Sequence, residues 1–274
     1  MRLTAEDVTL GYGPAPVVSG LHFDVAEGEI MVIAGASGCG KTTLLRGLAG
    51  LLPPVRGRFL GDGAAITGAA PDRALVFQDD ALLPWRSAQR NVELPLAIRG
   101  LPRRERAARA GHWLAQVGLA GQESRLPREL SGGMRQRVQL ARTLAGGPRA
   151  ILMDEPFGAL DAQTRATMQR LLIKVWNASP TTVVFVTHDV DEALFLGDQV
   201  GVLGAGGITE MITVPHKRDP GARSAPEVAA ARARILALLG PGAAAGAANG
   251  VPVGPARATT QNTAEPMAAT AGTG

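Results

Sequence analysis

The sequence predicts an α/β fold: a mostly parallel sheet with flanking helices, joined by an antiparallel β subdomain and a helical insert subdomain. Residues 30–34, 150–153 and 182–187 are apolar or β-branched, which is typical of parallel strands buried on both faces. Segments with the helical spacing of apolar residues alternate with these strands. Such an alternation favours a doubly wound core, in which ligands bind at the carboxyl ends of the strands.

The other elements follow from turn residues and from apolar spacing. Residues 3–10 and 21–25 alternate apolar and polar side chains in places, which suits strands of a half-exposed sheet. A helix over 41–52 is expected to end at the prolines that follow it. Further strands are expected at 56–60, 64–66, 73–77, 199–203 and 208–214, and further helices at 132–144, 162–176, 190–196 and 226–239.

The chain changes character from residue 79 to about residue 128. Residues 91–98 and 103–117 carry helical patterns, and Pro95 is expected to interrupt the first of them. We therefore expect a helical subdomain over about 79–128, inserted between two strands of one nucleotide-binding domain over residues 1–240.

Composition narrows the classes of function. The 274-residue chain has a net charge of +4 and a pI of about 9.9, but its basic residues are dispersed and no nucleic-acid-reading motif accompanies them. We expect no nucleic-acid partner, no membrane-spanning helix, and a cytosolic protein without a signal peptide. The single cysteine, Cys39, excludes an intrachain disulfide. Residues 241–274 have almost no large apolar side chain, which predicts a disordered tail.

A glycine-rich loop follows the buried strand at 30–34. Gly35 to Thr42 fits G-x-x-x-x-G-K-S/T, the phosphate-binding loop of nucleoside triphosphatases, in its required strand–loop–helix context; a chance glycine-rich turn is the alternative. Its backbone N–H groups and the helix N-terminus attract phosphate, Lys41 adds a charge for the β- and γ-phosphates, and Thr42 offers a hydroxyl to Mg²⁺. The expected nucleotide-binding residues here are Gly35, Ser37, Gly38, Cys39, Gly40, Lys41, Thr42 and Thr43.

Two acidic residues end the apolar strand at 150–153. Asp154 at a strand end near a phosphate loop is placed to hold Mg²⁺, directly or through water. Glu155 then lies where it can polarise an attacking water as a general base. Acidic residues after strands are common, so the phosphate loop is what makes this pair informative.

A second phosphate-binding device lies further along the chain. Residues 130–137 read L-S-G-G-M-R-Q-R, in which Ser131 offers a hydroxyl. Gly132 and Gly133 allow backbone N–H groups at a helix N-terminus to approach an anion. An ordinary capped helix is the alternative.

The phosphate loop, the stretch at 130–137 and the acidic strand end at 154–155, in this order along the chain, resemble the ATP-binding cassette (ABC) family over roughly residues 3–214. The resemblance implies an ATPase that uses ATP and Mg²⁺. It implies that Tyr12 stacks on adenine, although a turn tyrosine packed on the sheet is the alternative. It implies that Gln78 reaches Mg²⁺ and the attacking water. It also implies that His188 contacts the γ-phosphate and orients Glu155.

The resemblance also implies a partner. In the family, two copies of the chain sandwich two ATP molecules head to tail, so that Ser131 of one copy faces the γ-phosphate held by the other. Charge that develops on a transferring phosphoryl group needs donors on several sides. Dividing the donors between two subunits makes hydrolysis depend on closure of the dimer.

A narrower resemblance comes from residues 76–85, which include Leu82-Leu83-Pro84-Trp85. With residues 132–138 and 155–161, this stretch is similar to the nitrate/sulfonate/taurine-type importer ATPases. It implies a peripheral subunit on the cytoplasmic face of the cell inner membrane, bound to integral membrane permease subunits and, through them, to a periplasmic or extracellular substrate-binding protein. Residues 82–85 are expected at the surface that receives the permease; a locally buried Trp85 is the alternative.

The transported substrate is not encoded in these motifs. Taurine and alkanesulfonates rank first, and nitrate, bicarbonate and thiamine-precursor systems share the pattern. The alternative function is a soluble ABC ATPase that acts on nucleic acid or ribosomes, but residues 44–129 show no coiled-coil heptads and the chain holds one cassette. Half of an exporter would usually carry membrane spans, which the sequence lacks.

Overall fold

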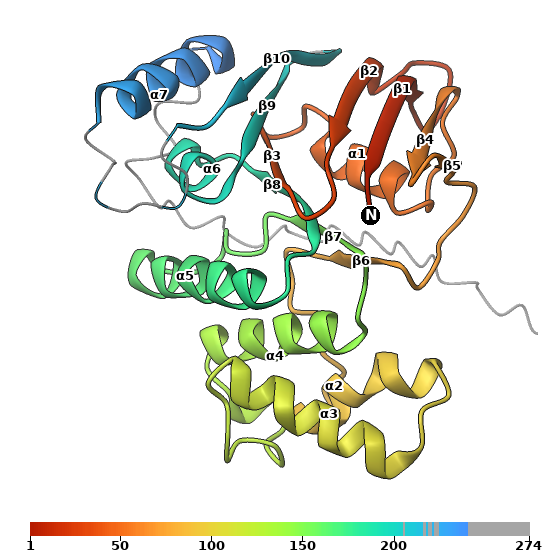
Figure 1. Ribbon diagram of the computed structural model, residues 1–274, viewed down its shortest axis with the longest axis vertical. Helices are drawn as coiled ribbons and strands as arrows, with labels where there is room; N and C mark the ends of the chain where they lie inside the picture. The colour runs from red at the N-terminus through yellow and green to blue at the C-terminus, as the bar shows by residue number, and fades with distance from the viewer. Residues whose placement is uncertain (205, 216–217, 219–220, 222–224, 241–274) are drawn as a thin grey trace, which may run out of the picture.

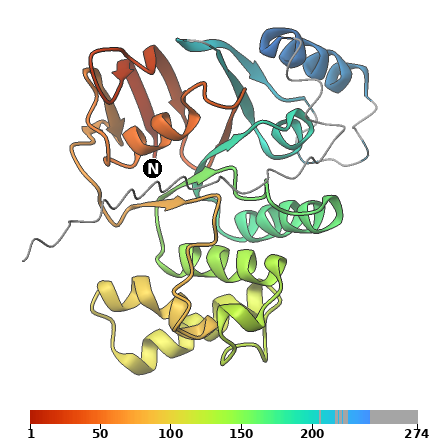
Figure 2. The ribbon, with the colours of Figure 1, turned by 180° about the vertical axis from the view of Figure 1, so that it is seen from behind.

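A computed structural model describes residues 1–204, 206–215, 218, 221 and 225–240. Two sheets form one end of the molecule, and three packed helices form the other end (Figure 1). The same arrangement is visible from behind (Figure 2). The predicted tail at 241–274 lies outside the described residues.

The larger sheet has six strands in the order β10-β9-β3-β8-β7-β6. Strands β3, β8, β7, β6 and β9 run parallel, and β10 is antiparallel to β9. Every residue of β3 and β8 is buried, as their continuous apolar or β-branched sequence predicts. Their bounds are β3 Ile30–Gly35, β6 Arg73–Val76, β7 Ala150–Asp154, β8 Thr182–Thr187, β9 Gln199–Gly204 and β10 Gly207–Thr213.

The smaller sheet is antiparallel, in the order β2-β1-β4-β5. Buried side chains alternate with more exposed ones over much of its strands, as in a sheet with one solvated face. Helix α1 (Lys41–Leu48) packs its buried leucines into a core shared with both sheets. The strand bounds are β1 Leu3–Leu10, β2 Val18–Val25, β4 Arg56–Gly61 and β5 Ala64–Ala65.

The helical end consists of α2 (Ala88–Ile98), α3 (Arg103–Gln116) and α4 (Gly132–Ala145), which pack on one another. A core of buried residues continues from these helices to the other face of the larger sheet. Helices α5 (Ala162–Ala178), α6 (Val190–Leu196) and α7 (Pro226–Leu239), with a short 3₁₀ turn at Pro127–Glu129, complete the described chain. None of the described helices combines the length and apolar character that a bilayer crossing requires.

The predicted α/β class with its antiparallel sheet and helical insert is confirmed, with corrections to single elements. The first helix ends at Leu48, not at residue 52, because residues 49–52 form turns at its end. The prediction that Pro95 interrupts the second helix is wrong, since α2 continues through it to Ile98. Packing of α2 against α3 and α4 outweighs the hydrogen bond that the proline cannot donate.

Candidate nucleotide-binding and hydrolysis site

The loop between β3 and α1 has a backbone that only glycine adopts easily at two positions. Gly38 and Gly40 have φ angles of +81° and +104°. Gly35 is needed for a different reason: an added Cβ there would lie 2.6 Å from Cys39 Sγ and 2.9 Å from the Leu203 carbonyl oxygen. The glycines of the motif therefore serve loop shape and close packing, as a phosphate-binding loop requires.

Lys41 places its ammonium group inside the loop. The side chain is only 5% exposed, and its Nζ donates to the carbonyl oxygens of Gly35 at 2.8 Å and Ala36 at 2.9 Å. The same Nζ lies 3.3 Å from Glu155 Oε1. A buried ammonium needs such partners, and the loop positions it for an incoming anion.

Glu155 follows β7 and has an unusual backbone, with a φ of +44°. Its N–H donates to the Val186 carbonyl of β8 at 3.0 Å, which turns the side chain toward the residue that follows β8. Glu155 Oε2 accepts a hydrogen bond from His188 Nδ1 at 2.8 Å. Two residues 33 positions apart in the chain meet because β7 and β8 are neighbouring parallel strands.

The hydrogen bond shifts the pKa of both partners. It is the main cause that lowers the pKa of Glu155, against the opposing effect of burial. It is also the main cause that raises the pKa of His188. Glu155 is therefore a carboxylate near neutral pH, able to accept hydrogen bonds or a proton.

Asp154 lies beside the start of α1. Burial raises the pKa of its carboxyl, and a hydrogen bond with the Thr42 side chain opposes that shift. A carboxylate and a hydroxyl side by side are hard oxygen donors that suit Mg²⁺, and a cation there would offset the burial of Asp154. The described residues contain no cluster of three or more histidine, cysteine or acidic side chains that could hold a metal ion.

Tyr12 and Gln78 lie at two other edges of this region. The Tyr12 ring is 60% exposed; its hydroxyl accepts from Arg46 Nη1 at 3.0 Å, and a hydrogen bond with Thr43 is the main cause that lowers its pKa. The ring is therefore not packed on the sheet. Gln78 is exposed just after β6, and a Cβ added at Gly158 would lie 3.8 Å from both Gln78 Nε2 and Glu155 Oε2. Gln78 and Glu155 thus approach the same glycine.

Ser131 is the N-cap of α4, where its Oγ accepts from the Met134 N–H at 3.3 Å. With Gly132 and Gly133 it lines a cavity of about 570 Å³, closed on another side by residues 159–161 and Thr164. A separate cavity of about 500 Å³ lies beside the phosphate loop, and no residue lines both. The two predicted phosphate-binding devices thus line different cavities.

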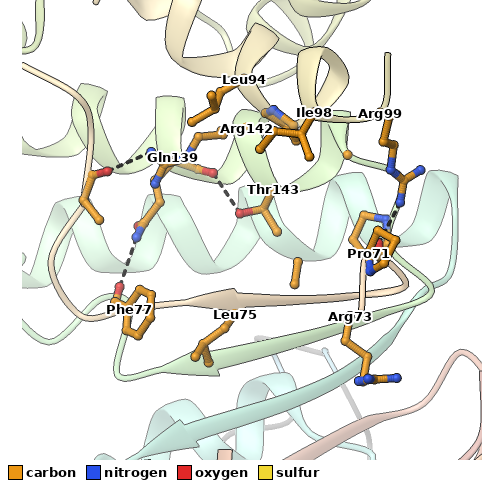
Figure 3. A pocket seen from close by; sticks show the side chains of 15 residues that line it. Pro71, Arg73, Leu75, Phe77, Leu94, Ile98, Arg99, Gln139, Arg142 and Thr143 are labelled. Carbon is orange, nitrogen blue, oxygen red and sulfur yellow. Dashed lines mark hydrogen bonds between the residues drawn. The ribbon is translucent and has the colours of Figure 1, made fainter. Parts of the chain in front are cut away.

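A groove of about 370 Å³ lies between β6 and the helices α2 and α4 (Figure 3). Leu75, Leu94 and Ile98 give it apolar walls. The sequence offered no role for Gln139 and Arg142, yet both join α4 to the segment that carries Gln78. Gln139 Nε2 donates to the carbonyl oxygens of Phe77 at 3.0 Å and Asp79 at 2.9 Å, and Arg142 donates to those of Asp80 and Ala81.

The fold and the loop geometry define a phosphate-loop nucleoside triphosphatase. A family model described as "ABC transporter" matches residues 18–158, about half of the chain. The chain therefore belongs to the ABC transporter family, and its place there makes it an ATP-binding, ATP-hydrolysing subunit.

Named relatives and a solved structure are similar to most of the chain. A taurine import ATP-binding protein of Chromobacterium violaceum is 47% identical over 246 residues, which cover 86% of this chain and 94% of the relative. One of Rhizobium johnstonii is 53% identical over 183 residues, covering 67% and 70%. A dimeric ATP-binding cassette, solved after hydrolysis with ADP and phosphate, is 32% identical with a TM-score of 0.70, covering 78% of this chain and 99% of that one.

Proposed function

We propose that the chain hydrolyses ATP to energise a membrane importer of taurine or a related sulfonate. The geometry that carries the ATPase part is the convergence of Lys41, Glu155 and His188 at the carboxyl ends of β3, β7 and β8. The relatives named as taurine import ATP-binding proteins support the transport part and the substrate class. Nitrate and bicarbonate, also small anions, remain the other substrates that the sequence pattern allows.

ATP would be bound along the smaller sheet and the phosphate loop. Tyr12 offers an exposed aromatic face on which adenine can stack. The backbone N–H groups of residues 35–43 and the N-terminus of α1 would surround the phosphates. Lys41 would exchange its two loop carbonyls for β- and γ-phosphate oxygens, and its position inside the loop supports that role.

Mg²⁺ would be held by Thr42 and Asp154, with Gln78 as a further ligand near Glu155. The hydrogen bond between Thr42 and Asp154 supports this assignment because it places two oxygen donors together. When bound, the ion would supply positive charge to the β- and γ-phosphates.

Hydrolysis would depend on Glu155 as the general base. Its lowered pKa keeps it ionised, so that it can accept the proton of an attacking water. His188 would hold that carboxylate through the 2.8 Å hydrogen bond and present its other ring nitrogen to the γ-phosphate. Gln78, whose Nε2 approaches the same Gly158 as Glu155 Oε2, would help to position the water.

A second copy of the chain would complete each ATP site. Ser131, Gly132 and Gly133 line a different cavity from the one beside the phosphate loop, which supports a role for them at the ATP held by the other copy. The similar cassette solved as a dimer with ADP and phosphate supports a head-to-tail pair.

The groove between β6, α2 and α4 would receive the membrane permease subunits. Trp85 lies just before α2, is 73% exposed and lines a different hollow from this groove; it would add an aromatic anchor of the kind that dominates interface energetics. Docking there would hold the chain peripherally on the cytoplasmic face of the inner membrane. A substrate-binding protein would act only through the permease.

Reconstitution tests the proposal directly. The chain is combined in vesicles with the permease and binding protein encoded beside it, and uptake of radiolabelled taurine, an alkanesulfonate and nitrate is measured with ATP. Taurine or alkanesulfonate uptake that stops when Lys41→Ala replaces the wild type is expected. ATP hydrolysis without any uptake, together with stable co-purification of nucleic acid or ribosomes, would contradict the transport assignment.

A further inference from the structure

A buried carboxyl lies directly behind the loop that carries His188. Glu192, in the first turn of α6, is only 5% exposed and lines none of the cavities described above. Thr187 Oγ1 donates to its Oε2 at 2.6 Å, and Gln169 Nε2 donates to its Oε1 at 3.0 Å. Both carboxyl oxygens therefore have a partner, and both partners are side chains from other elements.

The Thr187 hydroxyl links Glu192 to the backbone on both sides of His188. Thr187 immediately precedes the histidine, and its Oγ1 also accepts from the Asp189 N–H at 3.0 Å. Asp189 Oδ1 in turn accepts from the N–H of Glu192 at 3.0 Å, as the N-cap of α6. The two residues that flank His188 are thus joined to Glu192 by two hydrogen bonds and to each other by a third.

The other end of this network is on α5. Gln169 lies one turn beyond Arg165, whose Nη1 is 3.3 Å from Asp189 Oδ2 and whose Nη2 donates to the Leu160 carbonyl at 3.1 Å. Gln169 and Arg165 therefore hold the histidine loop at two points. The loop that bears His188 is fixed relative to α5 and to residue 160, which lines the Ser131 cavity.

Removing a carboxyl from water costs free energy, yet the protein buries the carboxyl of Glu192. Burial raises the pKa of Glu192, and the hydrogen bonds from Thr187 and Gln169 oppose that shift; Asp189 and Arg165 are the nearby charged groups. An apolar side chain in this place would avoid the cost of burial but would leave the Thr187 hydroxyl without its acceptor. The carboxyl thus serves the geometry of the loop.

We propose that Glu192 is a positioning residue for ATP hydrolysis: through the Thr187 hydroxyl it fixes the backbone that presents His188 to Glu155. The inference rests on the proposed roles of Glu155 and His188. The hydrogen bond between His188 and Glu155 is 2.8 Å long, so a displacement of the loop by about 1 Å would break it. Small misplacements of this kind lower turnover more than they weaken the binding of substrate.

The test uses the purified full-length chain and compares Glu192→Gln, Thr187→Val and Thr187→Ser. The amide that Glu192→Gln introduces has only one oxygen. Its NH₂ group would face either Gln169, which also donates, or Thr187, whose hydroxyl would then have to turn its proton away from residue 192 and accept instead. We expect Glu192→Gln and Thr187→Val to lower kcat about 10- to 100-fold while KM for ATP changes less than about twofold. Thr187→Ser keeps the hydroxyl and is expected to retain most of the activity.

A matched control is available in the helical end. Glu93 on α2 is also 5% exposed and also accepts from a glutamine, Gln89 Nε2 at 2.9 Å, but it lies outside the histidine network. Glu93→Gln should leave kcat near the wild-type value. Thermal unfolding of every variant shows whether it is folded at the assay temperature.

A spectroscopic readout separates positioning from general destabilisation. In nucleotide-free protein labelled at the histidine ring nitrogens, Glu192→Gln and Thr187→Val should move the His188 signals, while Thr187→Ser and Glu93→Gln should not. Wild-type kcat for Glu192→Gln, or a loss of kcat with unchanged His188 signals, would overturn the inference.

The same assay distinguishes the two layers of the proposal. If Glu155→Gln retains full turnover, the proposed role of Glu155 fails, whatever Glu192→Gln does. If Glu155→Gln is inactive while Glu192→Gln and Thr187→Val match the wild type, only the positioning role of Glu192 is wrong.

Discussion

The phosphate-loop region and the Ser131 region both resemble phosphate-binding devices, but they differ in how complete each is within one chain. Around the phosphate loop, Lys41, Glu155 and His188 are already joined by contacts of 3.3 Å or less. Around Ser131, the cavity offers a hydroxyl and glycine backbone, and Lys41, Glu155 and His188 are not among the residues that line it. Glu155 and its hydrogen-bond partner His188 meet within one chain, whereas in our proposal the phosphate contact of Ser131 is made to the ATP of another chain.

The physical reason for the difference is the sheet. Parallel neighbours bring the residues after β3, β7 and β8 to one edge, however far apart they lie in the sequence. Ser131 instead precedes α4, in the helical end of the molecule. One region can be tested by single substitutions, and the other only by mixing chains.

The largest expected effect comes from removing the base. Glu155→Gln keeps shape but cannot accept a proton, so ATP turnover should fall by about 10²- to 10⁴-fold, measured as phosphate release. ATP should still bind and hold the chain as a dimer in size-exclusion chromatography. Glu105→Gln, at an exposed carboxylate paired with Arg109, is the control that should remain active. Normal turnover in Glu155→Gln would mean that the phosphate-loop region does not hold the general base, which is what sets it apart from the Ser131 region.

A mixing experiment tests whether the regions act across two copies. Lys41→Ala and Ser131→Arg should each be inactive alone. When the two are mixed, half of the dimers contain one of each and carry one intact composite site, so about a quarter of wild-type turnover should return. Mixing two preparations of the same variant is the control. No recovery in the mixture, with dimers present, would mean that Ser131 does not complete the partner's site.

The smallest expected effect concerns pH and stability. The pKa of Glu155 is lowered, so its contribution to the free energy of unfolding is fully present above pH 4.5 and is lost as the pH falls through its folded-state pKa. The pKa of His188 is raised, so its contribution to the free energy of unfolding is fully present below pH 6.5 and is lost as the pH rises through its folded-state pKa. Between these limits, His188→Gln should lower Tm by about 1–3 °C, because the histidine is half-exposed.

The pH dependence of the His188→Gln effect on Tm also decides the control and the contradicting result. His22→Gln, at an exposed histidine of the smaller sheet outside this site, is the control variant measured over the same pH range. A Tm difference for His188→Gln that grows steadily above about pH 7 would contradict the hydrogen bond between His188 and Glu155 as its cause.

Much of the candidate site could be predicted because its signals are local. The glycine loop, the acidic pair after an apolar strand and the capped helix at Ser131 each depend on residues within a few positions of one another. The predicted roles of Tyr12, Gln78 and His188 came from resemblance to a family, and the structure places Gln78 and His188 close to Glu155. The roles themselves stay predictions until the substitutions are made.

Other features could not be predicted because they depend on distant partners. Pro95 signals a helix break by its own chemistry, yet packing against α3 and α4 keeps α2 continuous. Gln139 and Arg142 look like ordinary helix residues, and only the structure shows their side chains on the carbonyl oxygens around Gln78. Glu192 carries no sequence signal that separates it from a surface glutamate.

The sequence by itself determined where strands and helices alternate and indicated the class of chemistry: which side chains are expected to bind phosphate and which carboxylate is expected to act as a base. These properties reside in residue types at short spacing, where backbone geometry and helix termini act locally. Only the tertiary structure decided that Lys41, Glu155 and His188 meet, that Ser131 stands apart from them, and that Glu192 supports the histidine loop. Those outcomes depend on which strands become neighbours and which side chains are buried together, and neither is a property of any short segment.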